Sequence, residues 1–85
     1  MYSLRFGSRA TRELGGCPED LREALLGAIQ GLAQDPRPPG SKKLSGALAG
    51  AWRIRVRSHR VIYDVYDKER RVLIVKVGPR KSIYR

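Results

Sequence analysis

The segment WRIRVRSHR, residues 52–60, concentrates side chains suited to binding phosphate: Arg53, Arg55, Arg57 and Arg60. The first three alternate with apolar residues, which is the period of a strand. Side chains at positions i and i+2 of a strand lie about 7 Å apart, and a guanidinium group offers paired N–H donors to phosphate oxygens. The spacing therefore suits neighbouring phosphates of an extended nucleic acid. The alternative interpretation is a solvated sheet face with an excess of positive charge.

Positive charge is concentrated in the second part of the chain. The 85 residues carry a net charge of +10, yet residues 1–36 hold four basic against five acidic residues. Residues 37–85 hold fourteen basic residues against three acidic ones. This asymmetry predicts a polyanionic partner. Nucleic acid is the first expectation, an acidic protein the second, and a membrane surface a weak third.

Cysteine content and hydropathy limit the class of protein further. Cys17 is the single cysteine, so an internal disulfide and a multi-cysteine metal site are excluded. The longest apolar run, Val72–Val75, is too short to span a bilayer, and no signal peptide is recognised. We therefore expect a cytoplasmic protein without membrane contact, and nothing in the sequence indicates a metal or another cofactor.

These basic residues need a sheet and helices to position them. Apolar residues at period 2 predict a first strand in YSLRF, residues 2–6. Two helices follow, one capped by Ser8 and ended by Gly15–Gly16, the other beginning at Pro18 with an apolar stripe at helical spacing. Residues 35–46 are a loop by composition, and Lys42 and Lys43 in it are either solvated or in contact with a phosphate backbone. Three further strands are expected at about 51–57, 60–67 and 72–77.

The order β-α-α-β-β-β predicts a single α+β domain over residues 1–85. Its small antiparallel sheet would carry the N-terminal helix pair on one face.

Alternation along the predicted hairpin assigns its side chains to two faces. The apolar face, which should carry the helices, has Trp52, Ile54, Val56, Val61, Tyr63 and Val65. The other face has Arg53, Arg55, Arg57, Arg60, Ile62, Asp64 and Tyr66. Both two-residue turns that fit the sequence, Arg57–Ser58 and Ser58–His59, give this result. Arg57 leaves the face if it lies in the turn, His59 points away from Arg60, and Asp64 is placed to pair with Arg53.

The segment after the last strand adds further basic and aromatic residues. Gly78–Pro79 ends the strand, and Arg80, Lys81, Tyr84 and Arg85 follow. Tyr84 could stack on a base or donate its hydroxyl, or it could simply cover the sheet edge.

Taken in order, several pieces of the chain resemble one protein family across nearly its whole length. The pieces are YSLRF, LAQDPRP, KKLSG, WRIRVRSHRVIYDV and VLIVKVGPRKSIYR. They resemble the RelE/ParE superfamily of bacterial toxin–antitoxin toxins, and the hairpin is most similar to the RelE-type branch. The resemblance implies a ribosome-dependent endoribonuclease that cleaves mRNA in the A site of the small subunit. It also implies attack of a ribose 2′-hydroxyl on the adjacent phosphate, no cofactor, and inhibition by a cognate antitoxin protein.

The resemblance also implies roles for individual residues. Arg53 and Arg55 fall where the prototype has two lysines, and Arg60, Arg80 and Tyr84 fall on matching residues, so these five are the expected catalytic set. Arginine is effectively never deprotonated, so Arg53 and Arg55 would neutralise the phosphate and stabilise the transition state rather than act as a base. Tyr84 is the stronger candidate for proton transfer and His59 a weaker one. The remaining expected RNA contacts are Lys42, Lys43, Arg57, Lys81 and Arg85.

Two other functions remain open at this point. The shared fold allows a ParE-type inhibitor of DNA gyrase, which a supercoiling assay would reveal. Arginine at both lysine positions also allows a non-catalytic RNA or ribosome binder, which would bind RNA in a salt-sensitive manner without cutting it.

Overall fold

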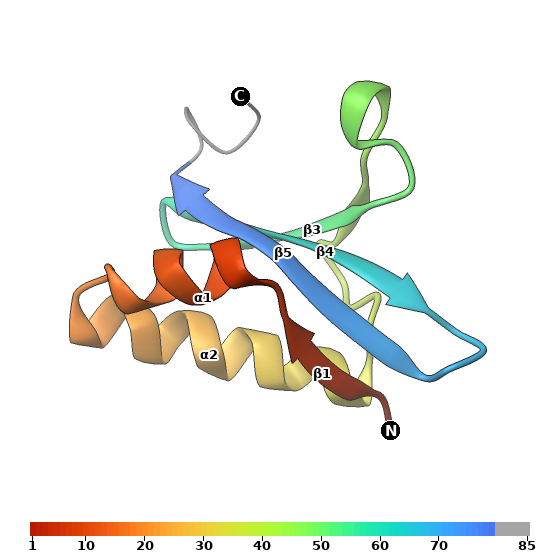
Figure 1. Cartoon of the computed structure of the whole chain (residues 1–85), viewed down its shortest axis with the longest axis horizontal. Helices are drawn as coiled ribbons and strands as arrows, with labels where there is room; N and C mark the ends of the chain where they lie inside the picture. Colours follow the sequence, from red (N-terminus) through yellow and green to blue (C-terminus); the bar gives the residue numbers. More distant parts are fainter. Residues whose placement is uncertain (80–85) are drawn as a thin grey trace.

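The computed structural model describes residues 1–79, so Arg80, Lys81, Tyr84 and Arg85 lie outside the described residues. Two helices pack on one face of a five-stranded sheet (Figure 1). The elements are β1 (Ser3–Phe6), α1 (Ser8–Gly15), α2 (Glu19–Gln34), β2 (Lys42–Lys43), the 3-10 helix η1 (Gly46–Leu48), β3 (Trp52–Val56), β4 (His59–Tyr66) and β5 (Arg71–Pro79). The predicted α+β class and helix pair are confirmed.

The sheet is mixed rather than wholly antiparallel, which corrects the predicted arrangement. Its strand order is β1-β5-β4-β3-β2; β2 to β5 pair antiparallel, and β1 pairs parallel with β5. Period-2 alternation identifies a strand but does not give its neighbour or its direction. The short strand β2 also lies inside the predicted loop, where Lys42 pairs with Arg53 and Lys43 with Trp52.

Both helices begin near the predicted positions. The N-cap of α1 is Gly7 rather than Ser8, which is the first helical residue. A Cβ on Gly7 would lie 3.3 Å from the carbonyl oxygen of Ile74, so glycine allows the chain to leave the sheet beside β5. Helix α2 follows Pro18 and has Glu19 and Asp20 in its first turn, where negative charge favours the helix dipole.

The main core lies between the helices and the sheet. It consists of buried residues from both layers: Ala10, Leu14, Leu25, Ile29, Leu32, Ile54, Val61, Tyr63, Val72, Ile74 and Val77. A second, small cluster of Ala51 and Ile62, with Leu44 packed against it, lies on the other face. The segment that contains η1 rises from that other face (Figure 1). Leu44, which lies between β2 and η1, therefore packs on the helix-free face.

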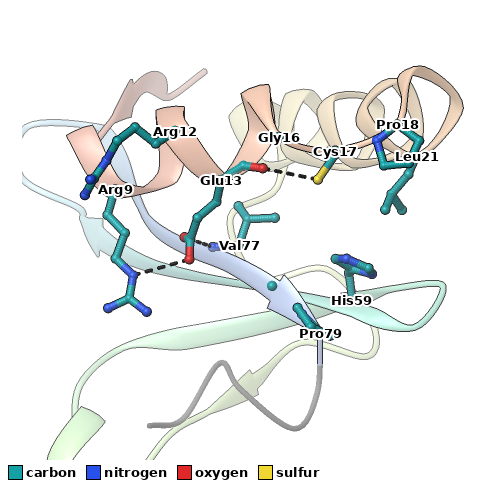
Figure 2. Close-up of a pocket in the computed structure, with 11 residues that line it drawn as sticks. Arg9, Arg12, Glu13, Gly16, Cys17, Pro18, Leu21, His59, Val77 and Pro79 are labelled. Atoms are coloured by element: carbon teal, nitrogen blue, oxygen red, sulfur yellow. Dashed lines mark hydrogen bonds and ion pairs between the residues drawn. The ribbon is translucent and has the colours of Figure 1, made fainter.

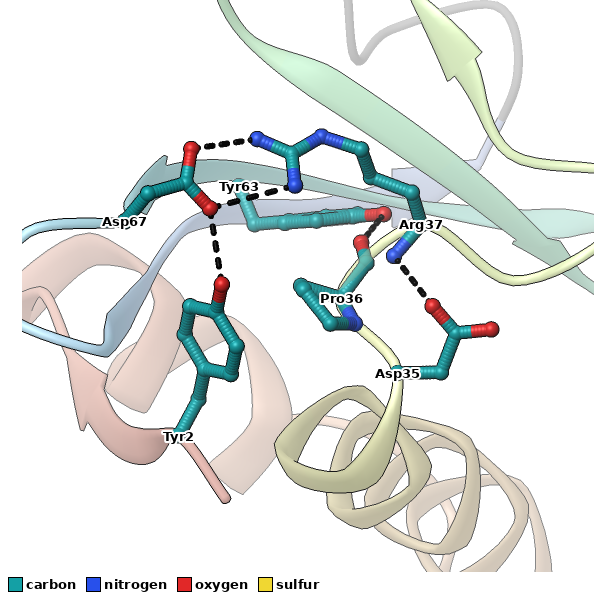
Figure 3. Close-up of polar contacts among 6 residues, drawn as sticks. All are labelled: Tyr2, Asp35, Pro36, Arg37, Tyr63 and Asp67. Carbon is teal, nitrogen blue, oxygen red and sulfur yellow. Dashed lines mark hydrogen bonds and ion pairs between the residues drawn. The ribbon is translucent and has the colours of Figure 1, made fainter.

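The segment after α2 is fastened to the sheet at two points (Figure 3). The buried Tyr63 hydroxyl donates to the carbonyl oxygen of Pro36 at 2.7 Å, and burial raises the pKa of Tyr63 to about 12. The Asp67 carboxylate accepts from the guanidinium of Arg37 at 2.8 Å and from the Tyr2 hydroxyl at 2.7 Å. These hydrogen bonds hold the pKa of Asp67 below its usual value. Arg37 also lies 5.3 Å from the ring centroid of Trp52, so the chain enters the β2 loop from a fixed position.

Candidate nucleic-acid interface

The strand register gathers cationic residues on the helix-free face of the sheet. Arg53 lies opposite Lys42 on one side and Ile62 on the other, and Arg55 lies opposite Arg60. Ile62 in turn lies opposite Lys76 of β5. This register confirms the two faces predicted for residues 52–66, with Arg57 in the turn rather than on the face. We call this set the basic face: Lys42, Arg53, Arg55, Arg60 and Lys76.

Two arginines of the basic face are nearly buried, which the sequence did not predict. Arg53 is 8% exposed and Arg60 is 5% exposed, whereas Arg55 is exposed to solvent. Arginine is rarely buried in folded proteins, and like charges opposite one another weaken a sheet. A face that served solubility alone would leave its guanidinium groups in water. The arrangement instead favours binding of an anion in a fixed position.

A hollow of about 300 Å³ lies at the β2 end of the basic face. Gly40, Lys42, Arg53 and Arg55 line it. Its volume is at the lower end of the range for small-molecule sites, about 300 to 1,000 Å³. Three cations around one hollow can bind a phosphate group with several charge-assisted hydrogen bonds.

Arg57, Lys43 and His59 lie away from the basic face. Arg57 is the first residue of the β3–β4 turn, with a φ of 56°, and its Nη1 is 3.4 Å from Asp20 of α2. Lys43 pairs with Trp52, which belongs to the apolar face. His59 lies opposite Val56 and lines a hollow of about 500 Å³ beside the helices (Figure 2). The structure thus does not bring His59 together with Arg60, and proton transfer by His59 stays a prediction without support from its position.

Two further charged residues of this face, Asp64 and Lys76, differ from the sequence predictions. No ion pair joins Asp64 to Arg53 within residues 1–79, although that pair was expected; burial raises the pKa of Asp64. Lys76 was missed because simple alternation from Val72 and Ile74 would place it on the apolar face. An irregular register at Ile62/Tyr63 sets Ile62 opposite Lys76 and Tyr63 opposite Ile74, so Lys76 changes face. The one sequence signal for it is a single charge within an apolar strand.

Within residues 1–79, no group of three or more His, Cys, Asp or Glu side chains could hold a metal ion. No helix in that part of the chain is long and apolar enough to cross a membrane.

Comparison with known proteins identifies the family. A family model described as the ParE toxin of the type II toxin–antitoxin system parDE matches residues 4–84. Toxin RelG of Mycobacterium tuberculosis is 33% identical over 85 residues, which is 99% of this chain and 97% of the relative. The crystal structure of the M. tuberculosis toxin–antitoxin complex RelBE2 matches with a TM-score of 0.83 at 29% identity, over 93% of this chain and 98% of the matched one. The isolated E. coli RelE toxin matches with a TM-score of 0.79 at 28% identity, over 93% and 84% of the two chains. The chain therefore belongs to the RelE/ParE superfamily of type II toxin–antitoxin toxins.

Proposed function

We propose that this toxin is a ribosome-dependent endoribonuclease that cleaves mRNA in the A site of the small subunit, in the cytoplasm. The observation that carries the proposal is the basic face, where the nearly buried Arg53 and Arg60 flank the exposed Arg55. Guanidinium groups held in place before the substrate arrives stabilise developing negative charge without reorganising in the reaction. The structural similarity to the E. coli RelE toxin also supports the proposal.

The reaction is attack of a ribose 2′-oxygen on the adjacent phosphorus. The bond from phosphorus to the 5′-oxygen of the next nucleotide breaks, which leaves a 2′,3′-cyclic phosphate and a 5′-hydroxyl. A base takes the proton of the 2′-hydroxyl, and an acid donates a proton to the departing 5′-oxygen. The negative charge of the pentavalent phosphorane is greatest at its non-bridging oxygens, and these are the atoms that the arginines would contact.

The roles proposed for the individual residues follow from the chemistry of their side chains. Arg53, Arg55 and Arg60 neutralise the scissile phosphate, and Arg80 adds a fourth guanidinium from the segment after β5. Lys42 and Lys76, at the two sides of the basic face, extend the contacts to neighbouring phosphates. Because arginine does not release its proton, Tyr84 is the proposed proton-transfer group or the residue that stacks on the scissile nucleotide. Lys81 and Arg85 are proposed RNA contacts beside them.

A cognate antitoxin is the proposed protein partner. The similar structures include the toxin–antitoxin complexes RelBE2 of M. tuberculosis and RelBE of E. coli. An acidic antitoxin segment laid over the basic face would neutralise Arg55 and Lys42 and block access of RNA.

Primer extension on ribosome-bound mRNA with a vacant A site tests the proposal. Wild-type toxin should produce cuts at the A-site codon, and Arg60→Ala and Tyr84→Phe should reduce the cleavage rate by at least about a hundredfold and about tenfold, respectively. A folded wild-type toxin that binds ribosomes but leaves the mRNA intact would refute cleavage and favour the non-catalytic binder.

Inhibition of DNA gyrase is the second candidate, because the family model that matches residues 4–84 is that of the ParE toxin. A supercoiling assay with purified gyrase distinguishes the two functions. Loss of supercoiling at micromolar toxin, together with intact ribosome-bound mRNA, would establish the second candidate in place of the first.

A further inference from the structure

Near the end of β5, the Glu13 carboxylate of α1 accepts a backbone hydrogen bond that a neighbouring strand would otherwise accept. Strand β1 pairs with β5 only as far as Phe6 opposite Ile74, and the Gly7 N–H then donates to the Ile74 carbonyl oxygen at 2.9 Å. From there the chain leaves the sheet as α1, while β5 continues to Pro79. The backbone N–H of Val77 donates to Oε1 of Glu13 at 2.9 Å (Figure 2).

The Glu13 carboxylate is itself held in place. Its Oε2 accepts from Nε of Arg9 at 3.3 Å, one helical turn earlier, and its side chain is 28% exposed. The carboxylate lies in the wall of the hollow of about 500 Å³ that also reaches Gly78 and Pro79. One oxygen therefore binds the strand and the other binds the helix, so the group joins α1 to the last part of β5.

Beyond Ile74, the outer edge of β5 has no neighbouring strand within residues 1–79. On its other side Gly78 lies opposite Arg60 and Pro79 lies opposite His59. Glycine has no side chain to pack and the largest backbone freedom, and proline has no N–H for a ladder hydrogen bond. The contact at Val77 therefore fastens this outer edge two residues before β5 ends at Pro79.

We propose that Glu13 is a positioning residue for RNA cleavage, an inference that rests on the proposed function. By holding Val77, it keeps Gly78 opposite Arg60 and fixes the point from which the chain continues to Arg80, three residues later. Glu13 lies on the helix side of the sheet and does not touch RNA. Its effect on the reaction comes through the placement of the groups that do.

Single-turnover cleavage of ribosome-bound mRNA, with ribosome binding measured separately, tests this role. Glu13→Ala should lower the maximal cleavage rate about tenfold or more with ribosome affinity kept within about threefold, because small displacements of catalytic groups cost rate more than binding. Glu13→Gln keeps a carbonyl oxygen for the Val77 N–H and should stay within about threefold of wild type in rate. Glu23→Ala removes the same charge from an exposed position on α2 and should behave as wild type. A wild-type rate in Glu13→Ala, or equal losses in Glu13→Gln and Glu13→Ala, would overturn the proposal.

A second readout does not require cleavage and separates this inference from the proposed function. In amide hydrogen exchange by NMR, Val77 should lose protection in Glu13→Ala and keep it in Glu13→Gln, and the backbone amide shifts of Gly78 and residues 80–85 should move only in Glu13→Ala. Unchanged protection and shifts in Glu13→Ala would refute the positioning role. If wild type does not cleave RNA at all, the proposed function fails, and this measurement still decides whether Glu13 holds the end of β5.

Discussion

Arg53 and Arg60 are the residues whose burial most strongly supports the proposed nuclease function. Both lie on the face without helices, both are less than a tenth exposed, and Arg60 lies directly opposite Arg55. Alternation predicted the face correctly, because strands β3 and β4 are regular from Trp52 to Val61. It could not predict burial, which depends on how distant parts of the chain pack around each side chain.

At the residue scale, Arg57 should limit stability. It is the first of two turn residues and has a positive φ, where a residue with a Cβ costs about 1–2 kcal/mol and glycine does not. Arg57→Gly also loses the exposed ion pair with Asp20, which is a small loss. We expect Arg57→Gly to raise the free energy of unfolding by about 0.5–1 kcal/mol in urea titrations. Arg57→Ala keeps the Cβ, so an equal gain in that variant would contradict the explanation.

Asp64 should destabilise the fold at neutral pH. Burial raises its pKa, so the folded state binds the proton more tightly than the unfolded state, and stability falls as the pH rises from the unfolded pKa through the folded pKa. Asp64→Asn should therefore be more stable than wild type at pH 7. The difference should disappear near pH 3, below the ordinary carboxyl pKa of about 3.9, where both states are protonated. Chemical unfolding at both pH values checks this, and a less stable Asp64→Asn at pH 7 would indicate a favourable ion pair instead.

At the scale of elements, the structure departs from the prediction in two situations. One is an irregular strand register, and the other is the pairing of strands that lie far apart in the sequence. The register irregularity at Ile62/Tyr63 moves Lys76 to the basic face. Lys42–Lys43 forms a strand because it pairs with Trp52 and Arg53 at the edge of the sheet. The composition of the two residues does not predict a strand. The parallel pairing of β1 with β5 likewise depends on the path of the helix pair. The predictable features were those set by local periodicity.

The fastening of the segment after α2 should contribute measurably to stability. Removing the Tyr63 hydroxyl leaves the Pro36 carbonyl oxygen without its donor in a buried position. We expect Tyr63→Phe to lower the free energy of unfolding by about 1–2 kcal/mol, measured by urea titration. Tyr66→Phe removes a hydroxyl from an exposed tyrosine and serves as the control. Equal stability of Tyr63→Phe and wild type would show that water replaces the lost donor.

At the scale of the whole molecule, the sheet separates the basic face from the face that the helices cover. The helices carry four of the five acidic residues of the first 36 positions, whereas residues 37–85 hold most of the positive charge. The sheet places part of that charge on the side away from the helices. The family, a cognate antitoxin as partner and the faces of β3 and β4 could be predicted from the sequence. The positions of residues 80–85 lie outside the described part of the chain, so the full expected catalytic set stays a prediction.

Binding of RNA to the basic face should depend strongly on salt. A single phosphate contact contributes about 0.7 to the slope of log K against log salt for a single strand. We expect Lys42→Ala to weaken binding of a single-stranded RNA oligonucleotide. It should also reduce the size of that slope by about 0.7, the value for one phosphate contact, measured by fluorescence anisotropy across a salt series. Lys68→Ala, in the turn between β4 and β5, should leave the slope unchanged. Equal effects of the two variants would mean that RNA binding follows net charge rather than the basic face.

The most direct test of the central claim removes a single 2′-oxygen from the substrate. Ribosome-bound mRNAs are prepared with either ribose or 2′-deoxyribose at the nucleotide whose 2′-oxygen would attack in the A site, and single-turnover cleavage by the wild-type toxin is followed. We expect the ribose mRNA to be cut to a 2′,3′-cyclic phosphate and the deoxyribose mRNA to remain intact at that position. Equal cutting of the two substrates would contradict the 2′-hydroxyl mechanism, and an uncut ribose mRNA in the presence of folded, ribosome-bound toxin would contradict the nuclease assignment itself.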